Sequence, residues 1–130
     1  MNNPPKILVV DDEPSLRELY EAELVHAGLS VVTATNGQEG VAAAKREQPD
    51  LILMDVSMPI MDGASAALAL KNDPDTKDIK LVFLTSLSDP NPAEIGIDVN
   101  VAKQVGALDF IKKGLPTKEF ILKVNQYIGR

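Results

Sequence analysis

The chain has 130 residues, 45% of them hydrophobic, which is enough for one domain with its own core. Cysteine is absent, so disulfides, thiolate metal sites and cysteine nucleophiles are excluded. The formal net charge of -6 disfavours nonspecific binding to a nucleic-acid backbone, because such binding needs clustered lysine and arginine. We therefore expect a single domain over residues 1–130, with no direct nucleic-acid partner.

The N-terminal segment 1–5 has neither the basic region nor the apolar stretch of a secretory signal. No apolar run in the chain approaches the length that spans a membrane. We expect this segment to be flexible, and the protein to be cytoplasmic and without a membrane partner.

Strand and helix signals alternate along the first half of the chain. Short apolar runs predict three strands, over residues 7–10, 29–34 and 51–54. Pro14 suits the first position of a helix that ends at Gly28, and the apolar side of this helix is expected to hold Leu16, Leu19, Tyr20 and Leu24, which repeat at helical spacing. A turn at residues 36–37 leads into a second helix over 38–47, which stops before Pro49 because a residue that precedes proline disfavours helical geometry.

The second half continues this alternation. Asp62 is expected to cap a helix that ends near residues 72–74, and apolar runs predict strands over 80–84 and 108–111. The last helix begins near residues 116–117, with an apolar side formed by Phe120, Ile121, Val124 and Ile128. Segment 86–105 begins with a polar loop broken by prolines, and a helix in it can be placed only approximately.

Strands that alternate with helices of about ten residues are typical of βαβ units and a parallel sheet. Right-handed crossovers then place helices on both faces of that sheet. The sequence therefore predicts an α/β fold in three layers, an αβα sandwich around a doubly wound sheet, with five strands and five helices.

Polar side chains follow the predicted strands at the point where each one ends. Asp55 comes directly after a strand that is apolar throughout, as expected for a strand buried on both faces. Asp11 and Asp12 follow the first strand, Thr85 follows the fourth, and a lysine pair at 112–113 follows the last. In open α/β sheets, ligands bind beyond the carboxyl ends of the strands, so we expect a functional site there.

These strand-end residues also carry a family resemblance. Asp11 and Asp12, the segment 55–63 with sequence DVSMPIMDG, Thr85, and the segment 106–113 with sequence GALDFIKK occur in order at successive strand ends. Over nearly its whole length the chain resembles the receiver domain of two-component response regulators, the CheY-like fold. The resemblance implies a flavodoxin-like, five-stranded parallel sheet with strand order 2-1-3-4-5.

The resemblance implies that Asp55 accepts a phosphoryl group. It further implies that Asp12 and Asp55 ligate Mg²⁺, with the backbone carbonyl of Ser57 as a third ligand and Asp11 acting through water. Carboxylate, carbonyl and water oxygens are ligands that suit Mg²⁺. The simpler alternative is that these acids only cap the turn or helix that follows each strand.

The resemblance selects Lys113, rather than Lys112, as the lysine of the site, because it lies three residues after the aromatic Phe110. It makes Thr85 and Phe110 a switch, in which the hydroxyl moves toward the phosphoryl group and the ring fills the space left behind. A solvated lysine, an ordinary strand threonine and a core aromatic are the alternatives. The chain departs from the family at Gly114, where a proline after a cis peptide is usual, and we expect a trans bond there.

The expected function is that of a receiver activated by phosphorylation. Its partners would be a histidine kinase or phosphotransfer protein and a downstream protein effector, and a homodimer through the switch face is possible. It would catalyse only its own phosphorylation and dephosphorylation, with Mg²⁺ as cofactor.

Two alternatives belong to other classes. A pseudo-receiver would bind protein partners without phosphorylation, and the unusual segment 86–105 and Gly114 favour it. A small α/β enzyme or flavodoxin-like cofactor binder would need a glycine-rich phosphate loop after Val10, where the chain has Asp11 and Asp12 instead.

Overall fold

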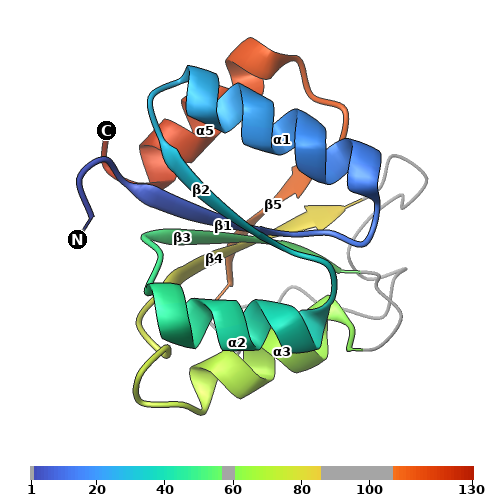
Figure 1. Ribbon diagram of the computed structural model, residues 1–130, viewed down its shortest axis with the longest axis vertical. Coiled ribbons are helices and arrows are strands. Elements are labelled where there is room, and N and C mark those ends of the chain that lie inside the picture. The colour runs from blue at the N-terminus through green and yellow to red at the C-terminus, as the bar shows by residue number, and fades with distance from the viewer. Residues whose placement is uncertain (1, 57–60, 86–106) are drawn as a thin grey trace.

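The computed structural model describes residues 2–56, 61–85 and 107–130 (Figure 1). Its five strands form one sheet in the order β2-β1-β3-β4-β5, and every neighbouring pair is parallel. The strands are β1 (Lys6–Val10), β2 (Ser30–Ala34), β3 (Leu51–Asp55), β4 (Lys80–Thr85) and β5 (Ala107–Lys112). The doubly wound parallel sheet and its strand order are therefore as predicted.

Helices cover both faces of this sheet. The helices α1 (Pro14–His26) and α5 (Thr117–Tyr127) lie on one face, and α2 (Gly37–Glu47) and α3 (Gly63–Lys71) lie on the other (Figure 1). Each face has its own cluster of buried apolar side chains. The three-layer sandwich is confirmed, while the helix expected within 86–105 falls outside the described residues.

Local signals explain where the helices begin and end. Pro14 is the first residue of α1, and Asp62 caps α3 by accepting a hydrogen bond from the Ser65 backbone N–H at 2.7 Å. Asn36 caps α2 in the same way, accepting from the Glu39 N–H at 2.9 Å. This helix therefore begins at Gly37, one residue earlier than predicted, because Asn36 acts as a helix cap and not as part of a separate turn.

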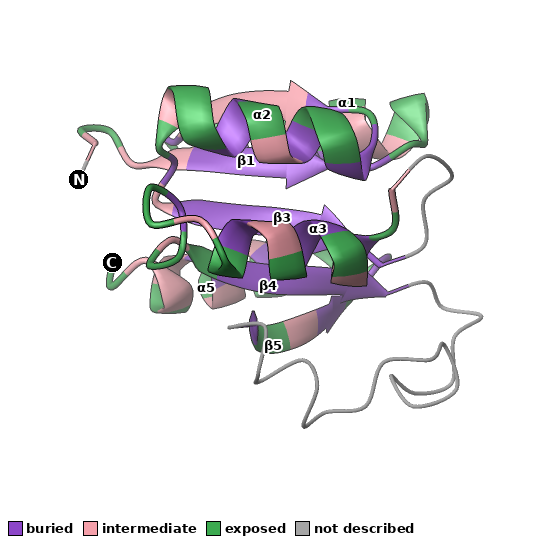
Figure 2. Ribbon diagram, turned by 90° about the horizontal axis from the view of Figure 1, so that it is seen from below, coloured by how far each residue is buried: buried purple, intermediate pink, exposed green. Residues whose placement is uncertain are grey.

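The central strands form the core. Every residue of β3 is buried, as expected for a strand covered on both faces (Figure 2). In α1 the residues Tyr20 and Leu24 face the sheet, whereas Leu19 is 49% exposed. The prediction that Leu19 shares the apolar side was wrong, because α1 buries the row of residues spaced four apart, and Leu19 lies beside that row.

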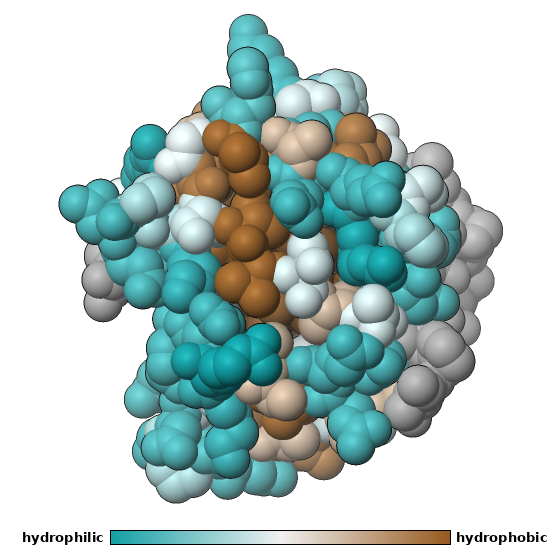
Figure 3. Space-filling model, viewed as in Figure 1, coloured by the Kyte–Doolittle hydropathy of each residue, from teal (hydrophilic) through white to brown (hydrophobic). Residues whose placement is uncertain are grey.

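The edge strand β2 is only half-buried, in contrast to its neighbour β1. Val31 and Val32 pack partly against the two core clusters, one on each face. Figure 3 shows apolar surface in the middle of the side where β2 runs. In the part of the chain that the structure describes, no helix has both the length and the apolar character needed to cross a membrane.

Candidate functional site

Adjacent strands bring the predicted acids together at the carboxyl end of the sheet. Asp55 is the last residue of β3, and Asp11 and Asp12 follow β1, which pairs with β3 in parallel up to Val10 and Met54. Carboxylate oxygens of the three aspartates all lie within 4.8 Å of one another. Asp11 is 0% exposed and Asp55 is 3% exposed, while Asp12 faces solvent.

Lys113 completes this cluster. Its Nζ lies 3.0 Å from Asp11 Oδ2 and 3.1 Å from Asp55 Oδ2, and the residue is buried. Lys112 is exposed, so the structure brings Lys113 and not Lys112 to the acids. Burial alone would lower the pKa of the Lys113 ammonium, but the two carboxylates outweigh it and raise the pKa above its usual value.

Strand alternation explains why these side chains meet. Successive side chains of a strand point to opposite faces, so residues two apart share a face. Asp11, Asp55 and Lys113 each lie two residues beyond a member of the buried cluster under α1 and α5. Those members are Val9, Leu53 and Ile111. The acid and lysine groups therefore continue the α1/α5 side of the sheet.

The two expected switch residues lie on the opposite side. Thr85 is buried at the end of β4, two residues after Phe83, which belongs to the cluster under α2 and α3. Phe110 pairs with Phe83 across β4 and β5, is partly buried, and stacks on it with ring centroids 5.6 Å apart. Thr85 and Phe110 thus share one face of neighbouring strands.

A hydrogen bond and a positive φ define the backbone conformation at residues 113–114. The Lys113 N–H donates to the Thr85 carbonyl at 2.7 Å, which extends the pairing of β4 with β5. Gly114 has φ +90°, a conformation that favours glycine and that proline cannot adopt, since its ring holds φ near about −65°. Among the described residues the cis peptide is Asn3–Pro4, so the Lys113–Gly114 bond is trans, as expected.

Two glycines that the sequence marked only as turn or cap neighbours support the site. A Cβ at Gly63 would lie 2.4 Å from the Asp55 carbonyl oxygen, and a Cβ at Gly37 would lie 2.3 Å from the Met61 carbonyl oxygen. The Gly37 N–H donates to that Met61 carbonyl at 3.2 Å. The starts of α2 and α3 therefore pack against the backbone of the site so closely that no side chain fits between.

The donor set fits a divalent cation. Three neighbouring carboxylates repel one another, and the single Lys113 ammonium cannot balance them. Their oxygens are ligands of the kind that Mg²⁺ prefers. Ser57, expected to add a backbone carbonyl, lies outside the described residues.

A family model, the response regulator receiver domain, matches residues 7–125, which include every residue of this cluster. The chain belongs to this family. The receiver domain is a signalling module of two-component systems, so the family expected from the strand-end motifs is confirmed.

Curated relatives of this receiver are regulators. This chain is 34% identical over 125 residues to the probable transcriptional regulator ycf27 of Porphyridium aerugineum, and the match covers 96% of this chain and 48% of the relative. It is 40% identical over 108 residues to the response regulator PleD of Caulobacter vibrioides, matching 83% of this chain and 22% of the relative. The chain thus spans about half the length of the ycf27 relative, and less of PleD.

Solved receiver structures have the same fold. The chemotaxis protein CheY4 of Vibrio cholerae is 28% identical, with a TM-score of 0.83 and coverage of 95% of this chain and 98% of that one. The receiver domain of sensor histidine kinase PA1611 from Pseudomonas aeruginosa is 26% identical, with a TM-score of 0.82 and coverage of 97% and 98%. The latter structure has a magnesium ion coordinated in its active site cleft.

Proposed function

We propose that this receiver accepts a phosphoryl group on Asp55 from a histidine kinase or phosphotransfer protein and then signals through a protein partner. The observation that carries the proposal is the buried Asp55 carboxylate, 3.1 Å from the Lys113 ammonium and clustered with Asp11 and Asp12. A capping role alone would not require a buried lysine between two buried acids.

In the proposed reaction a carboxylate oxygen of Asp55 attacks the phosphorus of a phosphohistidine. The P–N bond breaks, its electron pair stays on the imidazole nitrogen, and an aspartyl phosphate forms. The Lys113 ammonium offsets the negative charge on the transferred oxygens. Asp12 and Asp55, with Asp11 through water and the Ser57 carbonyl, would hold Mg²⁺, which when bound supplies further positive charge to the phosphoryl oxygens.

The response would pass through Thr85 and Phe110. The hydroxyl of Thr85 would favour the phosphorylated state by bonding the new phosphoryl oxygen, and Phe110 would then pack into the space that this movement opens. Such a switch requires that phosphate contacts one of two conformations better than the other.

The output surface we propose contains β5, the strand that holds Phe110, and α5, the helix that follows it in the chain. Leu108 in β5 and Leu122 in α5 are 54% and 60% exposed, so apolar surface is available for a protein effector or a second copy. The name of one relative, the regulator RpaA of Synechocystis, includes DNA binding. We assign no such role to these 130 residues, whose net charge of -6 disfavours it.

The test is phosphorylation by a small donor. The protein is incubated with Mg²⁺ and acetyl phosphate, and its intact mass is measured beside Asp55→Asn and Asp50→Asn. Asp50→Asn is the matched control, because Asp50 comes immediately before β3, the strand that ends in Asp55. One added phosphoryl group is expected in the wild type and the control, and none in Asp55→Asn or without metal. An unmodified wild type that also fails to bind Mg²⁺ would replace this proposal with the pseudo-receiver.

A further inference from the structure

The turn between β1 and α1 holds two of the three acids of the site, Asp11 and Asp12 (Figure 1). The protein itself holds the Asp11 carboxylate, because Oδ1 accepts a hydrogen bond from the Glu13 N–H at 2.9 Å and Oδ2 lies 3.0 Å from Lys113 Nζ. The Asp12 carboxylate is exposed and forms no hydrogen bond or ion pair with another residue that the structure describes. The direction of the Asp12 side chain therefore depends on the backbone that carries it.

One side chain of α1 fixes that backbone. Arg17 Nη1 donates to the Asp11 carbonyl at 2.8 Å, and this contact is partly buried. Side chains of a helix lean toward its N-terminus, so Arg17, the fourth residue of α1, reaches back over the first turn to a residue six positions earlier. The Asp11 N–H donates to the Ala34 carbonyl at 3.2 Å, which extends the pairing of β1 with β2. The Asp11 backbone is thus held on one side by β2 and on the other by α1.

The carbonyl that Arg17 contacts belongs to the peptide group joining Asp11 to Asp12. A peptide group is planar, so a donor on its oxygen fixes the plane from which the Asp12 side chain leaves. A hydrogen bond from a charged donor is also stronger than one between neutral groups. Within the described part of the chain, the Arg17 guanidinium forms no ion pair with a carboxylate that would draw it away from this carbonyl.

We propose that Arg17 is a positioning residue, which orients the Asp12 carboxylate toward a divalent cation through the Asp11 carbonyl. The inference rests on the Mg²⁺ site of the proposed function. Arg17 would not touch the metal, because a guanidinium has no acceptor atom to offer. Its two effects on a bound cation have opposite signs: its positive charge repels Mg²⁺, whereas its hydrogen bond favours binding by holding a ligand in place. The sign of the change when Arg17 is removed therefore separates positioning from charge alone.

The test compares the Mg²⁺ affinity of Arg17→Met with that of Arg46→Met by NMR titration. Both variants remove one guanidinium, and Arg46 contacts Glu47 near the amino end of the sheet. We expect Arg17→Met to bind Mg²⁺ roughly fivefold more weakly or worse, and Arg46→Met to bind it as the wild type does. The ¹³C signal of the Asp11 carbonyl, measured without metal, should move in Arg17→Met only. Arg17→Lys should recover most of the affinity, because an ammonium can donate to the same carbonyl.

Equal or tighter Mg²⁺ binding by Arg17→Met would overturn the inference, and so would an unmoved Asp11 carbonyl signal. An equal loss in Arg46→Met would also overturn it, since the loss would then follow net charge. The same holds if Arg17→Lys binds as weakly as Arg17→Met. A wild type that binds Mg²⁺ but takes no phosphoryl group from acetyl phosphate refutes the proposed function alone, and the titration still decides the role of Arg17. A wild type that binds no Mg²⁺ overturns both.

Discussion

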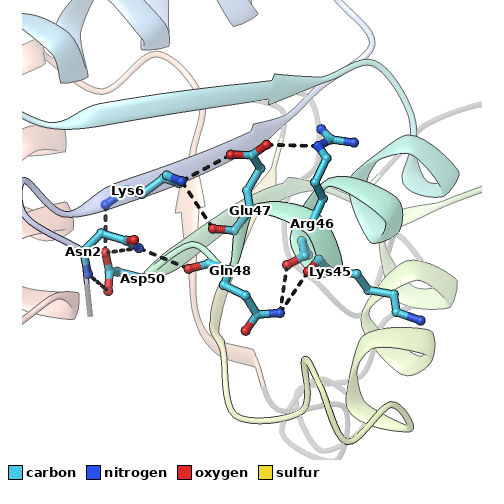
Figure 4. A network of polar contacts seen from close by, with 8 residues as sticks. Asn2, Lys6, Lys45, Arg46, Glu47, Gln48 and Asp50 are labelled. Atoms are coloured by element: carbon cyan, nitrogen blue, oxygen red, sulfur yellow. Dashed lines mark hydrogen bonds and ion pairs between the residues drawn. The ribbon is translucent and has the colours of Figure 1, made fainter.

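The two ends of the sheet pair lysine with carboxylates in opposite ways. At the carboxyl end the Lys113 side chain is 10% exposed and contacts Asp11, which is fully buried. At the amino end Lys6 Nζ lies 3.2 Å from Glu47, and these side chains are 23% and 28% exposed (Figure 4). The chemical groups are alike, so burial is the difference between the two ends.

Burial decides what each network can do. A buried ion pair gains little net stability because both groups lose water, yet removing one partner is severely destabilising. A partly exposed pair contributes little in either direction. At the carboxyl end the buried carboxylates and the ammonium are shielded from water, so their charges act strongly on a cation or a phosphoryl group at that edge of the sheet. At the amino end the polar contacts hold the N-terminal segment against the rest of the fold, since Asn2 bonds Gln48 and Asp50 there (Figure 4).

The largest expected effect is that of Lys113→Met. It leaves the Asp11 and Asp55 carboxylates without the ammonium, and we expect a loss of about 3 kcal/mol in the free energy of unfolding without metal. Added Mg²⁺ should restore part of this loss, because a cation at the acids replaces the missing charge. Urea denaturation with and without Mg²⁺ measures both. A loss that Mg²⁺ does not reduce would contradict the cation site.

Gly63→Ala tests backbone packing at the same end of the sheet. Its Cβ would lie 2.4 Å from the Asp55 carbonyl oxygen, so β3 or α3 must shift. We expect a loss of about 1–3 kcal/mol by urea denaturation, and slower phosphorylation of Asp55. Gly129→Ala adds a methyl group where no atom lies within 4 Å of a Cβ, so any loss there comes from its positive φ of +76° alone. A Gly63→Ala variant as stable as the wild type would show that the close approach does not matter.

Asp50→Asn tests the polar contacts at the amino end of the sheet. Burial favours a higher pKa for Asp50, but hydrogen bonds from the Lys6 N–H and from Asn2 outweigh it and lower the pKa below its usual value. The resulting stability is fully present above the unfolded-state pKa of about 3.9 and is lost as the pH falls through the lower folded value. In the variant, the free energy of unfolding should no longer fall in this way at acid pH. At pH 7 it should be lower than in the wild type by about 1 kcal/mol or less. Urea titrations between pH 2 and 7 measure it, and an unchanged pH profile would contradict the assignment.

Lys6→Met should have the smallest effect. Its ammonium contacts the partly exposed Glu47 carboxylate, and solvent screens that contact. We expect the urea midpoint to shift by no more than the error of the measurement, and Asp55 phosphorylation to be unaffected. If Lys6→Met and Lys113→Met proved equally destabilising, burial would not be what separates the two ends.

The sequence predicted the site's acids because each follows a short apolar strand, and parallel strands end at one edge. It could not choose between Lys112 and Lys113 without the family resemblance, since the choice depends on which side chain faces the buried acids. Tyr20 carried no sequence signal beyond helical spacing, because its ring partner Phe120 lies in α5, far along the chain.

Long-range contacts also occur at the N-terminus. The flexibility expected for segment 1–5 stays a prediction, but Asn2 bonds residues 46 and 48 positions further on. Propensity describes neighbours in sequence, and such bonds arise only once the sheet has formed. The wrong prediction for Leu19 has a related cause. Helical spacing shows which residues share a side of α1, but not how many of them the sheet buries.

The acids and the proposed switch residues lie on opposite faces of the sheet, and this has a consequence for how the protein can change. The acids and Lys113 continue the α1/α5 side, whereas Thr85 and Phe110 continue the α2/α3 side. Thr85, at the end of β4, belongs to both sides, because its carbonyl accepts from the Lys113 N–H while its side chain lies on the α2/α3 side. A substitution at Thr85 can therefore disturb both the lysine of the site and the packing around Phe110.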